Sequence, residues 1–237
     1  PPAGTTVTGS AGTTLWEAAT APGTRLPHLC HKPSTGYRAD GNCRACMVEI
    51  EGERVLAASC IRDVTDGMVV KTATERAEKS RALITELLAA DQPDVSHDKS
   101  SHLAEMMQLN NVEESRFPSR QADHVPLLDD SHVAMRVNLD ACIHCNLCVR
   151  ACREVQVNDV IGMAGRGHDA KIVFDMDDPM GHSTCVACGE CVQACPTGAL
   201  MPATVLDDDQ AGDSQDYDRE VQSVCPYCGV GCQLSFK

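Results

Sequence analysis

The chain has 237 residues, 43% of them apolar, but its aromatic residues are only one Trp, three Tyr and three Phe, so we expect small modules packed with aliphatic side chains. A formal charge of −14, from 34 acidic and 20 basic residues, argues against nucleic-acid binding, because phosphate contacts need concentrated Lys and Arg. The opening PPAGTTVTGS lacks the features of a signal peptide, and no apolar stretch approaches the ~20 residues that span a bilayer, which predicts a cytoplasmic protein without a membrane partner.

Short strands and turns with one early helix are predicted over residues 1–72. The segment 14–17 (TLWE) has capping-box spacing and predicts a helix that ends near Thr20. A long loop is expected over residues 26–46, which are rich in Pro and Gly. The stretch MVEIEGERVLAA alternates and carries Gly52 at its centre, which predicts a hairpin.

A closing helix and a linker are predicted over residues 73–136. The segment 72–75 (TATE) again has capping-box spacing, and the helix it begins is expected to end near Ala90. Its apolar residues are expected on one face: Ala77, Leu83, Ile84, Leu87 and Leu88. The remainder is polar, with an amphipathic piece near residues 103–109, and is interpreted as a linker lying over other surfaces.

An internal near-repeat occupies residues 137–205, with the copies CIHCNLCVRAC and CVACGECVQAC. Between the copies, VQVNDVIGM and KIVFDM indicate short strands separated by a Gly-rich turn. Residues 206–222 are strongly acidic and are interpreted as a solvated linker, and residues 223–237 contain the final motif CPYCGVGC.

Fifteen cysteines divide by spacing into four groups. These groups are Cys30, Cys43, Cys46 and Cys60; Cys142, Cys145, Cys148 and Cys152; Cys185, Cys188, Cys191 and Cys195; and the terminal triplet Cys225, Cys228 and Cys232. Disulfides, zinc or iron–sulfur clusters could explain them, and the odd count without a signal peptide disfavours disulfides.

The second and third groups follow Cys-x2-Cys-x2-Cys-x3-Cys, and Pro196 follows the later one. This pattern resembles bacterial ferredoxins that carry two 4Fe–4S clusters, in which the fourth cysteine of each run binds the other cluster. The resemblance implies a first cube set, Cys142, Cys145, Cys148 and Cys195, and a second cube set, Cys185, Cys188, Cys191 and Cys152. Zinc is the alternative, although tetrahedral zinc sites usually take two separated Cys-x2-Cys pairs.

The first group has the order of a plant-type 2Fe–2S ferredoxin, but its first gap of twelve residues is longer than that pattern has. It more closely resembles the N-terminal 2Fe–2S domain of the large iron–sulfur subunit of respiratory NADH dehydrogenase, which is a β-grasp fold. Gly36 and Gly41 are expected to let backbone N–H groups approach the sulfurs. Zinc remains an alternative for this group.

Relatives of that subunit usually carry a further cluster bound by one His and three Cys, whereas this chain has no cysteine between Cys60 and Cys142. His97 and His102 stand in the corresponding region and are interpreted as surface or hydrogen-bonded histidines, with that cluster lost. Histidines beside cluster cysteines, His31 and His144, are expected to pack there. Four arginines near the cysteines are expected to be exposed: Arg38, Arg44, Arg150 and Arg153.

The terminal triplet resembles the opening of molybdenum or tungsten bis-pterin oxidoreductases, whose fourth cysteine follows after a few tens of residues and would lie beyond Lys237. The three modules in this order resemble the α subunit of NAD-dependent formate dehydrogenase, through DGNCRACMVEIEG, CIHCNLCVRACREVQVNDVIGM, CVACGECVQACPTGALMP and SVCPYCGVGC. The predicted fold class is α+β. The predicted domains are a β-grasp 2Fe–2S domain (1–72), a helix and linker (73–136), a two-cluster 4Fe–4S domain (137–205), an acidic linker (206–222) and the start of a bis-pterin 4Fe–4S domain (223–237).

The resemblance implies electron transfer between formate or carbon dioxide and NAD. Its cofactors would be one 2Fe–2S cluster, two 4Fe–4S clusters, a third completed beyond Lys237, and a bis-molybdopterin guanine dinucleotide with molybdenum or tungsten in the missing part. A partner iron–sulfur subunit would hold FMN and NAD. No general acid, base or nucleophile is assigned within residues 1–237. The alternatives are an electron-transfer subunit of an NAD-linked hydrogenase, a free-standing polyferredoxin and a zinc-stabilised interaction protein.

Overall fold

The computed structural model describes residues 4–34, 36–98, 100–120, 124–203, 219–225 and 230–236. Its helices are α1 (Leu15–Thr20), α2 (Glu75–Ala90), α3 (His102–Leu109), η2 (Leu139–Ala141), α4 (Leu147–Arg150), the π-helix η3 (Ala151–Val155), η4 (Gly167–Asp169), η5 (Met180–His182) and α5 (Glu190–Ala194). Its strands are β1 (Met47–Ile50), β2 (Ala57–Ala58), β3 (Val70–Lys71), β4 (Met135–Val137), β5 (Ile161–Ala164), β6 (Lys171–Phe174), β7 (Leu200–Pro202), β8 (Val221–Val224) and β9 (Gln233–Phe236).

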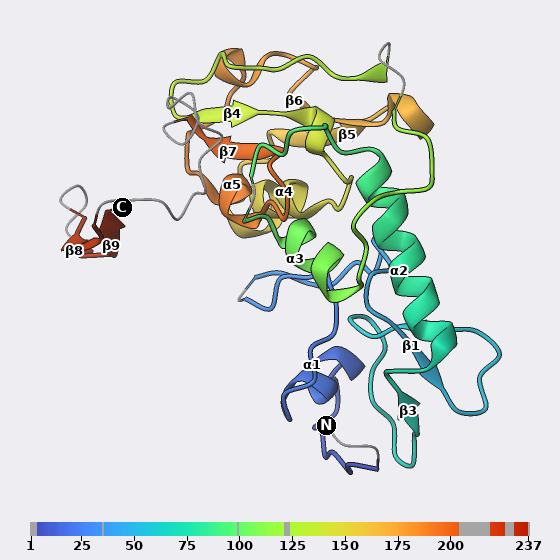
Figure 1. The fold of residues 1–237 in the computed structure, drawn as a ribbon. Helices are drawn as coiled ribbons and strands as arrows, with labels where there is room; N and C mark the ends of the chain where they lie inside the picture. Colours follow the sequence, from blue (N-terminus) through green and yellow to red (C-terminus); the bar gives the residue numbers. More distant parts are fainter. Residues whose placement is uncertain are drawn as a thin grey trace.

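Two bodies make up most of the fold (Figure 1). The N-terminal body contains α1 and β1–β3, and the second body contains β4–β7 with α4 and α5. Helix α2 runs from the first body toward the second, and α3 lies near their junction. None of the helices in the described ranges has the length and apolar character of a membrane span. The acidic linker predicted over 206–222 lies outside the described residues except for its last four.

Helix α1 begins at the predicted cap. The side chain of Thr14 accepts a hydrogen bond from the N–H of Glu17, and the Glu17 carboxylate accepts one from the N–H of Thr14 at 2.8 Å. This capping box satisfies two N–H groups that the first helical turn leaves unpaired. The helix buries Leu15 and Trp16 against the N-terminal body's sheet.

The predicted hairpin is confirmed. Strands β1 and β2 pair antiparallel with Met47 opposite Ala58, and Gly52 in the connection has a φ of +84°. Strand β3 pairs with the other edge of β1, which gives the strand order β2-β1-β3. Along β1, Val48 and Ile50 are buried in the core, as the period of two predicts.

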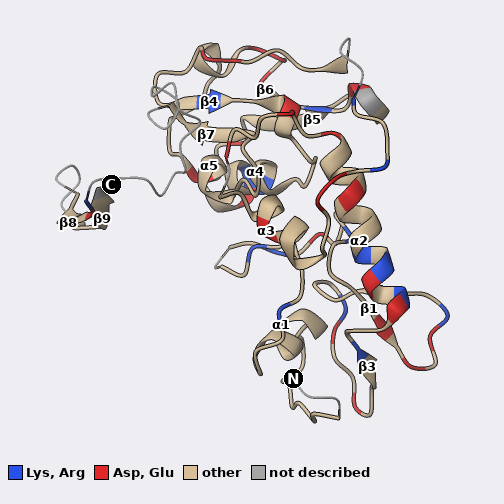
Figure 2. Ribbon diagram, viewed as in Figure 1, with Lys and Arg blue, Asp and Glu red and all other residues tan. Residues whose placement is uncertain are grey.

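Helix α2 ends where predicted, but its cap and its buried face differ from the prediction. Thr74, not Thr72, is the N-cap: its side chain accepts from the N–H of Ala77 at 3.2 Å and its hydroxyl donates to Glu49 at 2.8 Å. The buried positions include Ala77, Arg81 and Thr85, whereas Leu83 and Leu87 are 36% and 46% exposed. Figure 2 shows acidic and basic residues interspersed along this helix.

Arg81 explains the altered face of α2. Its Nη1 donates to the backbone carbonyls of Met47 at 2.9 Å and Thr72 at 2.8 Å, which ties the helix to the sheet. A charged hydrogen bond to a buried carbonyl replaces apolar packing at this position. The helix is thereby turned so that Leu83 and Leu87 face outward.

Helix α3 confirms the predicted amphipathic piece and shows how the linker packs. Ser101 caps it by accepting from the N–H of Ala104 at 3.2 Å. Leu103 and Met106 are buried together with Leu29 and Ala45 of the N-terminal body. The N–H of Leu103 donates to the carbonyl of Pro196 at 3.1 Å, so the same helix also contacts the second body.

The second body pairs its first and last strands. Strand β4 is antiparallel to β7, with Val137 opposite Leu200, and β5 is antiparallel to β6, with Ala164 opposite Lys171. The predicted strand VQVNDVIGM begins too early, because β5 starts only at Ile161. Residues 156–160 form a loop after the π-helix η3, with Val157 and Asp159 at positive φ.

Gly198 gives a first testable consequence of this packing. A Cβ built on Gly198 would lie 2.7 Å from Cβ of His97 and 3.0 Å from the backbone nitrogen of Asp98. We expect Gly198→Ala to lower the free energy of unfolding by about 1–3 kcal/mol, because backbone has to move. Denaturant unfolding of the cluster-loaded protein measures this change in the free energy of unfolding.

Gly162→Ala is the matched control for Gly198→Ala. Its added Cβ would meet only Cγ2 of Val173, at an ordinary 3.7 Å, so we expect a change within about 0.5 kcal/mol. Equal effects of the two substitutions would contradict the close approach of residues 97–98 to Gly198.

Candidate metal-cluster sites

The first cysteine group converges beside β1. Cys46 directly precedes β1 and Cys60 follows β2, and the N–H of Ser59 donates to the carbonyl of Cys46 at 3.2 Å. The long predicted loop carries Cys30 and Cys43 to the same place, where Cys30, Cys46 and Cys60 are all nearly fully buried. Strand register and loop together therefore assemble the group.

Backbone N–H groups point at the sulfurs of the first group. The N–H groups of Cys30 and Ala45 lie 3.4 and 3.5 Å from Sγ of Cys43, and the N–H of Cys43 lies 3.5 Å from Sγ of Cys30. One of the predicted glycines, Gly41, has a φ of +63°, and an added Cβ would lie 2.6 Å from Cδ1 of Ile61, so the Ile61 side chain would have to move. N–H donors of this kind stabilise negatively charged sulfur.

The four thiols of the first group also interact with one another. Hydrogen bonds from the thiols of Cys43 and Cys60 lower the pKa of Cys30, and the hydrogen bond with Cys60 lowers the pKa of Cys46. Hydrogen bonding to Cys30 raises the pKa values of Cys43 and Cys60 above the usual range. Each thiol of the group thus lies within hydrogen-bonding range of another, and four thiolates in this place would need metal cations to balance their charge.

The two copies of the internal repeat also share positive φ angles at matching positions. In the copy CIHCN, His144 and Asn146 have φ values of +52° and +63°. In the copy CVACG, Ala187 and Gly189 occupy the same positions, with φ values of +56° and +75°. Both loops therefore share a pattern of positive φ directly before a short helix, α4 or α5.

The first cube set lines one cavity. Cys142, Cys145, Cys148 and Cys195 border it together with apolar residues that include Ile172 and Leu200. Burial raises the pKa of Cys142 to about 11 and raises those of Cys145 and Cys148 further, because each charged sulfur would also face the others. The donor set and the apolar lining fit a metal cluster that balances the charge of four thiolates.

The second cube set lies closer to the surface. Burial, together with nearby charges on Cys185, Cys188 and Cys152, raises the pKa of Cys191 to about 12. The loop after η3 wraps around Cys152, whose sulfur accepts from the N–H of Val160 at 3.3 Å. Cys188 is exposed. Cys195 of the second repeat thus borders the cavity of Cys142, Cys145 and Cys148, and the charge of Cys152 reaches Cys191, while the two ligand sets stay a prediction.

The terminal triplet is only partly within the described residues. Cys225 and Cys232 flank the loop between β8 and β9, and the N–H of Cys225 donates to the carbonyl of Cys232 at 2.8 Å. Cys228 lies outside the described residues, and so do the residues beside it.

The two linker histidines are hydrogen-bonded or packed. Nε2 of His97 lies 2.9 Å from the carboxylate of Asp140, two residues before Cys142. His102 packs edge-on against His28, with ring centroids 4.6 Å apart, and burial with the charge of His102 lowers the pKa of His28 to about 4. No three His, Cys, Asp or Glu side chains within the described ranges converge on a position for a single metal ion.

Arg150 contradicts the prediction that the nearby arginines are exposed. Arg38, Arg44 and Arg153 are exposed, but Arg150 is buried at 2% exposure, between Cys148 and Cys152. Its position on a helix between apolar residues, in LCVRAC, is the one signal in the sequence that could have indicated burial.

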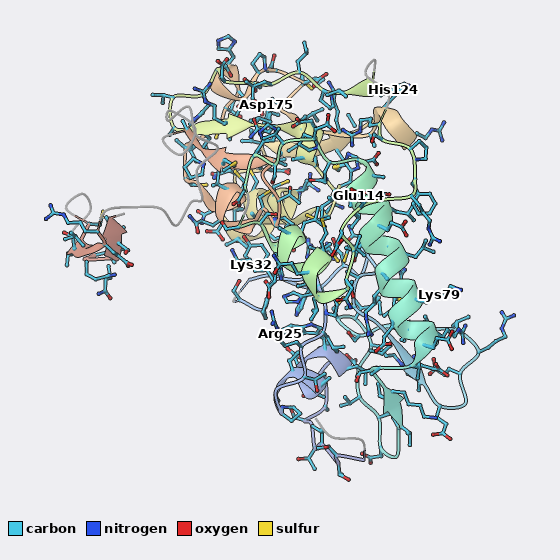
Figure 3. The ribbon with its side chains drawn as sticks, in the orientation of Figure 1. Arg25, Lys32, Lys79, Glu114, His124 and Asp175 are labelled. Carbon is cyan, nitrogen blue, oxygen red and sulfur yellow. The ribbon has the colours of Figure 1, made fainter. Side chains whose placement is uncertain are left out.

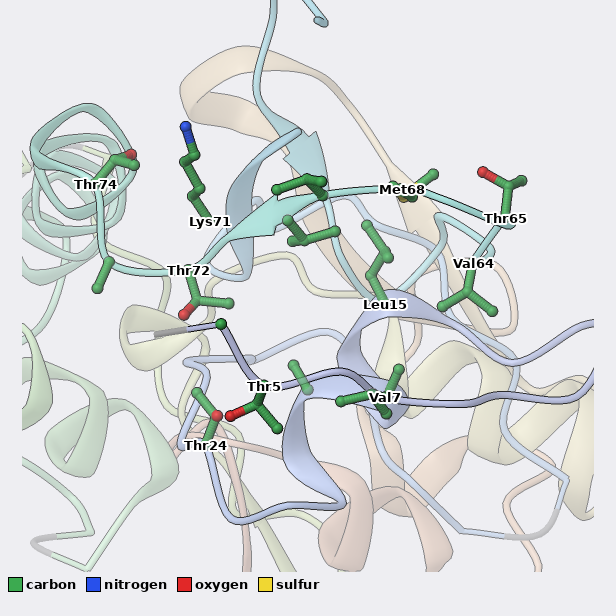
Figure 4. Close-up of a pocket in the computed structure, with 16 residues that line it drawn as sticks. Thr5, Val7, Leu15, Thr24, Val64, Thr65, Met68, Lys71, Thr72 and Thr74 are labelled. Carbon is green, nitrogen blue, oxygen red and sulfur yellow. The ribbon is translucent and has the colours of Figure 1, made fainter. Parts of the chain in front are cut away.

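A cavity with no cysteine in its lining lies in the N-terminal body (Figure 4). It measures about 630 Å³ and lies between residues 4–7, α1 and the segment around β3. Its lining consists of aliphatic and threonine side chains together with Lys71. It therefore offers no thiol, carboxylate or imidazole ligand.

Three family models match the chain in the predicted order. Residues 3–75 match a 2Fe-2S iron-sulfur cluster binding domain, residues 141–199 a 4Fe-4S dicluster domain, and residues 218–237 a molybdopterin oxidoreductase Fe4S4 domain. These matches confirm the predicted fold class and the family resemblance.

Several curated proteins are similar to most of the chain. It is 33% identical over 231 residues to a subunit of the NADH-quinone oxidoreductase of Rhizobium meliloti, covering 95% of this chain and 26% of that protein. It is 32% identical over 197 residues to a subunit of the NADP-reducing hydrogenase of Solidesulfovibrio fructosivorans, covering 80% and 33%. A putative formate dehydrogenase of Staphylococcus haemolyticus is 27% identical over 264 residues, covering 94% and 26%. The chain thus spans about a quarter to a third of these relatives.

A solved structure shares the fold. A crystal structure of an NAD+-reducing [NiFe]-hydrogenase in the H2-reduced state superposes with a TM-score of 0.73 at 28% identity, covering 83% of each chain. The likeness extends over both bodies, because neither body alone holds 83% of this chain.

Proposed function

We propose that this chain, which belongs to the iron–sulfur electron-transfer proteins of NADH-linked oxidoreductases, is the electron-transfer part of a formate dehydrogenase catalytic subunit. The observation that carries the proposal is the match of residues 218–237 to a molybdopterin oxidoreductase domain, directly after the two ferredoxin-type domains. A putative formate dehydrogenase is also similar over 94% of this chain.

The chain's own residues would hold a line of clusters. The first cysteine group would bind a 2Fe–2S cluster, the two cube sets would bind 4Fe–4S clusters, and the terminal triplet would share a further cluster with a cysteine beyond Lys237. Each cluster, when bound, carries electrons one at a time. The protein buries seven of the fourteen described cysteines and donates N–H hydrogen bonds to several of the sulfurs.

The remaining parts of the reaction belong to other segments or subunits in this proposal. A bis-molybdopterin guanine dinucleotide with molybdenum or tungsten would lie in the part of the protein after Lys237, where formate would react. A partner iron–sulfur subunit would hold FMN and NAD. Consistent with this, we expect the denatured polypeptide from its native source to weigh several-fold more than the 25.4 kDa of residues 1–237.

One experiment tests the substrate. We expect formate, added anaerobically to the complete enzyme, to reduce its clusters and produce their electron paramagnetic resonance (EPR) signals, because formate would be the electron donor. Hydrogen gas is the parallel addition, and NADH is the positive control that reaches the clusters from the partner side. Signals produced by hydrogen and not by formate would contradict the proposal.

A hydrogenase subunit is the second candidate, because both the superposed structure and one similar sequence belong to hydrogenases. It shares the two ferredoxin-type domains but does not account for the match at residues 218–237. A free-standing polyferredoxin is distinguished by mass: a native polypeptide near 25.4 kDa would favour it.

A further inference from the structure

A single buried arginine connects two of the proposed cluster sites. Arg150, the last residue of α4, lies between Cys148 and Cys152 in the sequence. Its Nη2 donates to the backbone carbonyl of Cys30 at 2.7 Å and lies 3.4 Å from that of Cys145. Cys30 belongs to the first cysteine group and Cys145 to the first cube set. One nitrogen atom thus contacts the backbones of both.

The rest of the guanidinium is paired as well. Its Nη1 donates to the carbonyl of Arg38, and its Nε lies 3.1 Å from Oδ2 of Asp40, whose side chain is only 14% exposed. Both contacts lie in the loop of the N-terminal body that leads to Cys43. A planar guanidinium can satisfy several fixed acceptors at once, which a lysine ammonium cannot do in the same geometry.

Other contacts show that the two sites meet at an ordered junction. Nδ2 of Asn42 donates to the same Cys145 carbonyl at 3.3 Å, and the hydroxyl of Tyr37 donates to Glu190 at 2.7 Å. Lys32, labelled in Figure 3 where the two bodies meet, donates to the carbonyl of Gln193 at 2.8 Å. Cys30 itself packs in the same buried cluster as Cys145 and Cys148.

Arg150 is more deeply buried than Lys32 and Tyr37, which also donate side-chain hydrogen bonds at this junction. A buried charge is retained only where it is fully paired, and removing it leaves its acceptors without a donor. Because reduction adds negative charge to a cluster, a buried cation between two clusters stabilises the reduced state of both.

We propose that Arg150 is a positioning residue that holds the 2Fe–2S site directly against the first cube set, so that the two clusters form a coupled electron-transfer pair. This inference rests on the proposed cluster ligands but not on formate as the substrate.

The test is an EPR-monitored redox titration of the complete enzyme carrying Arg150→Gln, Arg150→Lys or Arg153→Gln. For Arg150→Gln we expect lower midpoint potentials of both clusters and a weaker magnetic interaction between them when both are reduced. Arg150→Lys keeps the charge but not the planar fork, so we expect nearly normal potentials with a weakened interaction. Arg153 follows on η3 but is exposed and paired with Asp159, so Arg153→Gln should match the unchanged enzyme.

Unchanged potentials and interaction in Arg150→Gln, with full iron content, would overturn the inference. If Arg150→Gln fails to retain its clusters, the magnetic interaction in Arg150→Lys decides: an unchanged interaction overturns the inference, and a weakened one supports it. Absence of 2Fe–2S and 4Fe–4S signals from the unchanged enzyme would instead refute the proposed ligands. Reduction of those clusters by hydrogen and not by formate would refute the proposed substrate and leave the role of Arg150 standing.

Discussion

Cys152→Ser is expected to abolish the cluster of Cys185, Cys188 and Cys191 while leaving the cluster of Cys142, Cys145 and Cys148 in place. Cys195→Ser is expected to do the reverse. The reason is the arrangement of the two repeats. Cys195 borders the cavity of the first cube set, and the charge of Cys152 contributes to the raised pKa of Cys191 in the second cube set. A serine oxygen is a harder and far less acidic ligand than a thiol, so iron is lost from the affected site.

The measurement is iron content together with the EPR spectrum of the reduced, complete enzyme. Each substitution should remove about four irons per chain, the content of one 4Fe–4S cluster. Two reference variants identify the signals: Cys148→Ser removes a ligand of the first set, and Cys191→Ser a ligand of the second. We expect Cys195→Ser to lose the same signal as Cys148→Ser, and Cys152→Ser the same signal as Cys191→Ser.

Met176→Ala serves as the control, since Met176 is 91% exposed and should be replaceable without loss of iron. The opposite grouping, in which Cys152→Ser loses the signal of Cys148→Ser, would show that each run of four cysteines binds its own cluster. The prediction that each repeat supplies the fourth ligand of the other repeat's cluster would then be wrong, although the prediction of two 4Fe–4S clusters would still hold.

The local features of the fold could be predicted because short-range chemistry determines them. The capping box of Thr14 and Glu17 needs only residues three positions apart, and the turn at Gly52 needs only a residue that tolerates positive φ. Cysteine spacing predicted the cluster domains for the same reason: three ligands on one tight loop are a local pattern.

The features that were missed depend on contacts between distant segments. The buried face of α2 is decided by Arg81, whose acceptors are carbonyls of Met47 and Thr72, and no helical periodicity contains that information. The late start of β5 follows from the loop that wraps around Cys152. Arg150 was predicted to be exposed because arginines near cysteines usually are, whereas its acceptors in the N-terminal body, the carbonyls of Cys30 and Arg38, lie more than 100 residues earlier in the chain.

The second body places its thiols where other small domains place apolar side chains. Its buried cluster includes Cys145, Cys148, Cys152 and Cys191, and the cavity of the first cube set lies against Ile172 and Leu200. The N-terminal body has a separate apolar core that includes Leu15, Trp16, Leu26, Val48 and Ile50. The two bodies should therefore depend on their clusters to different degrees.

Removal of iron is accordingly expected to unfold the second body and to leave part of the N-terminal body folded. Structural zinc contributes roughly 10–16 kcal/mol to small domains, and whole domains are stable by only about 5–15 kcal/mol, so a body built around two clusters should not remain folded without them. The thiols of the first cube set, two of them buried and two partly buried, would also lose the contacts that a cluster provides.

Hydrogen exchange of the complete enzyme, before and after anaerobic chelation, measures this directly. We expect the amides of β4, β7 and α5 to lose their protection, while those of α1 and β1 retain part of theirs. Reconstitution with iron and sulfide is the control and should restore protection in the second body. Protection of the β4–β7 pair that survives complete removal of iron would show that the apolar residues hold this body together and that the clusters only occupy it.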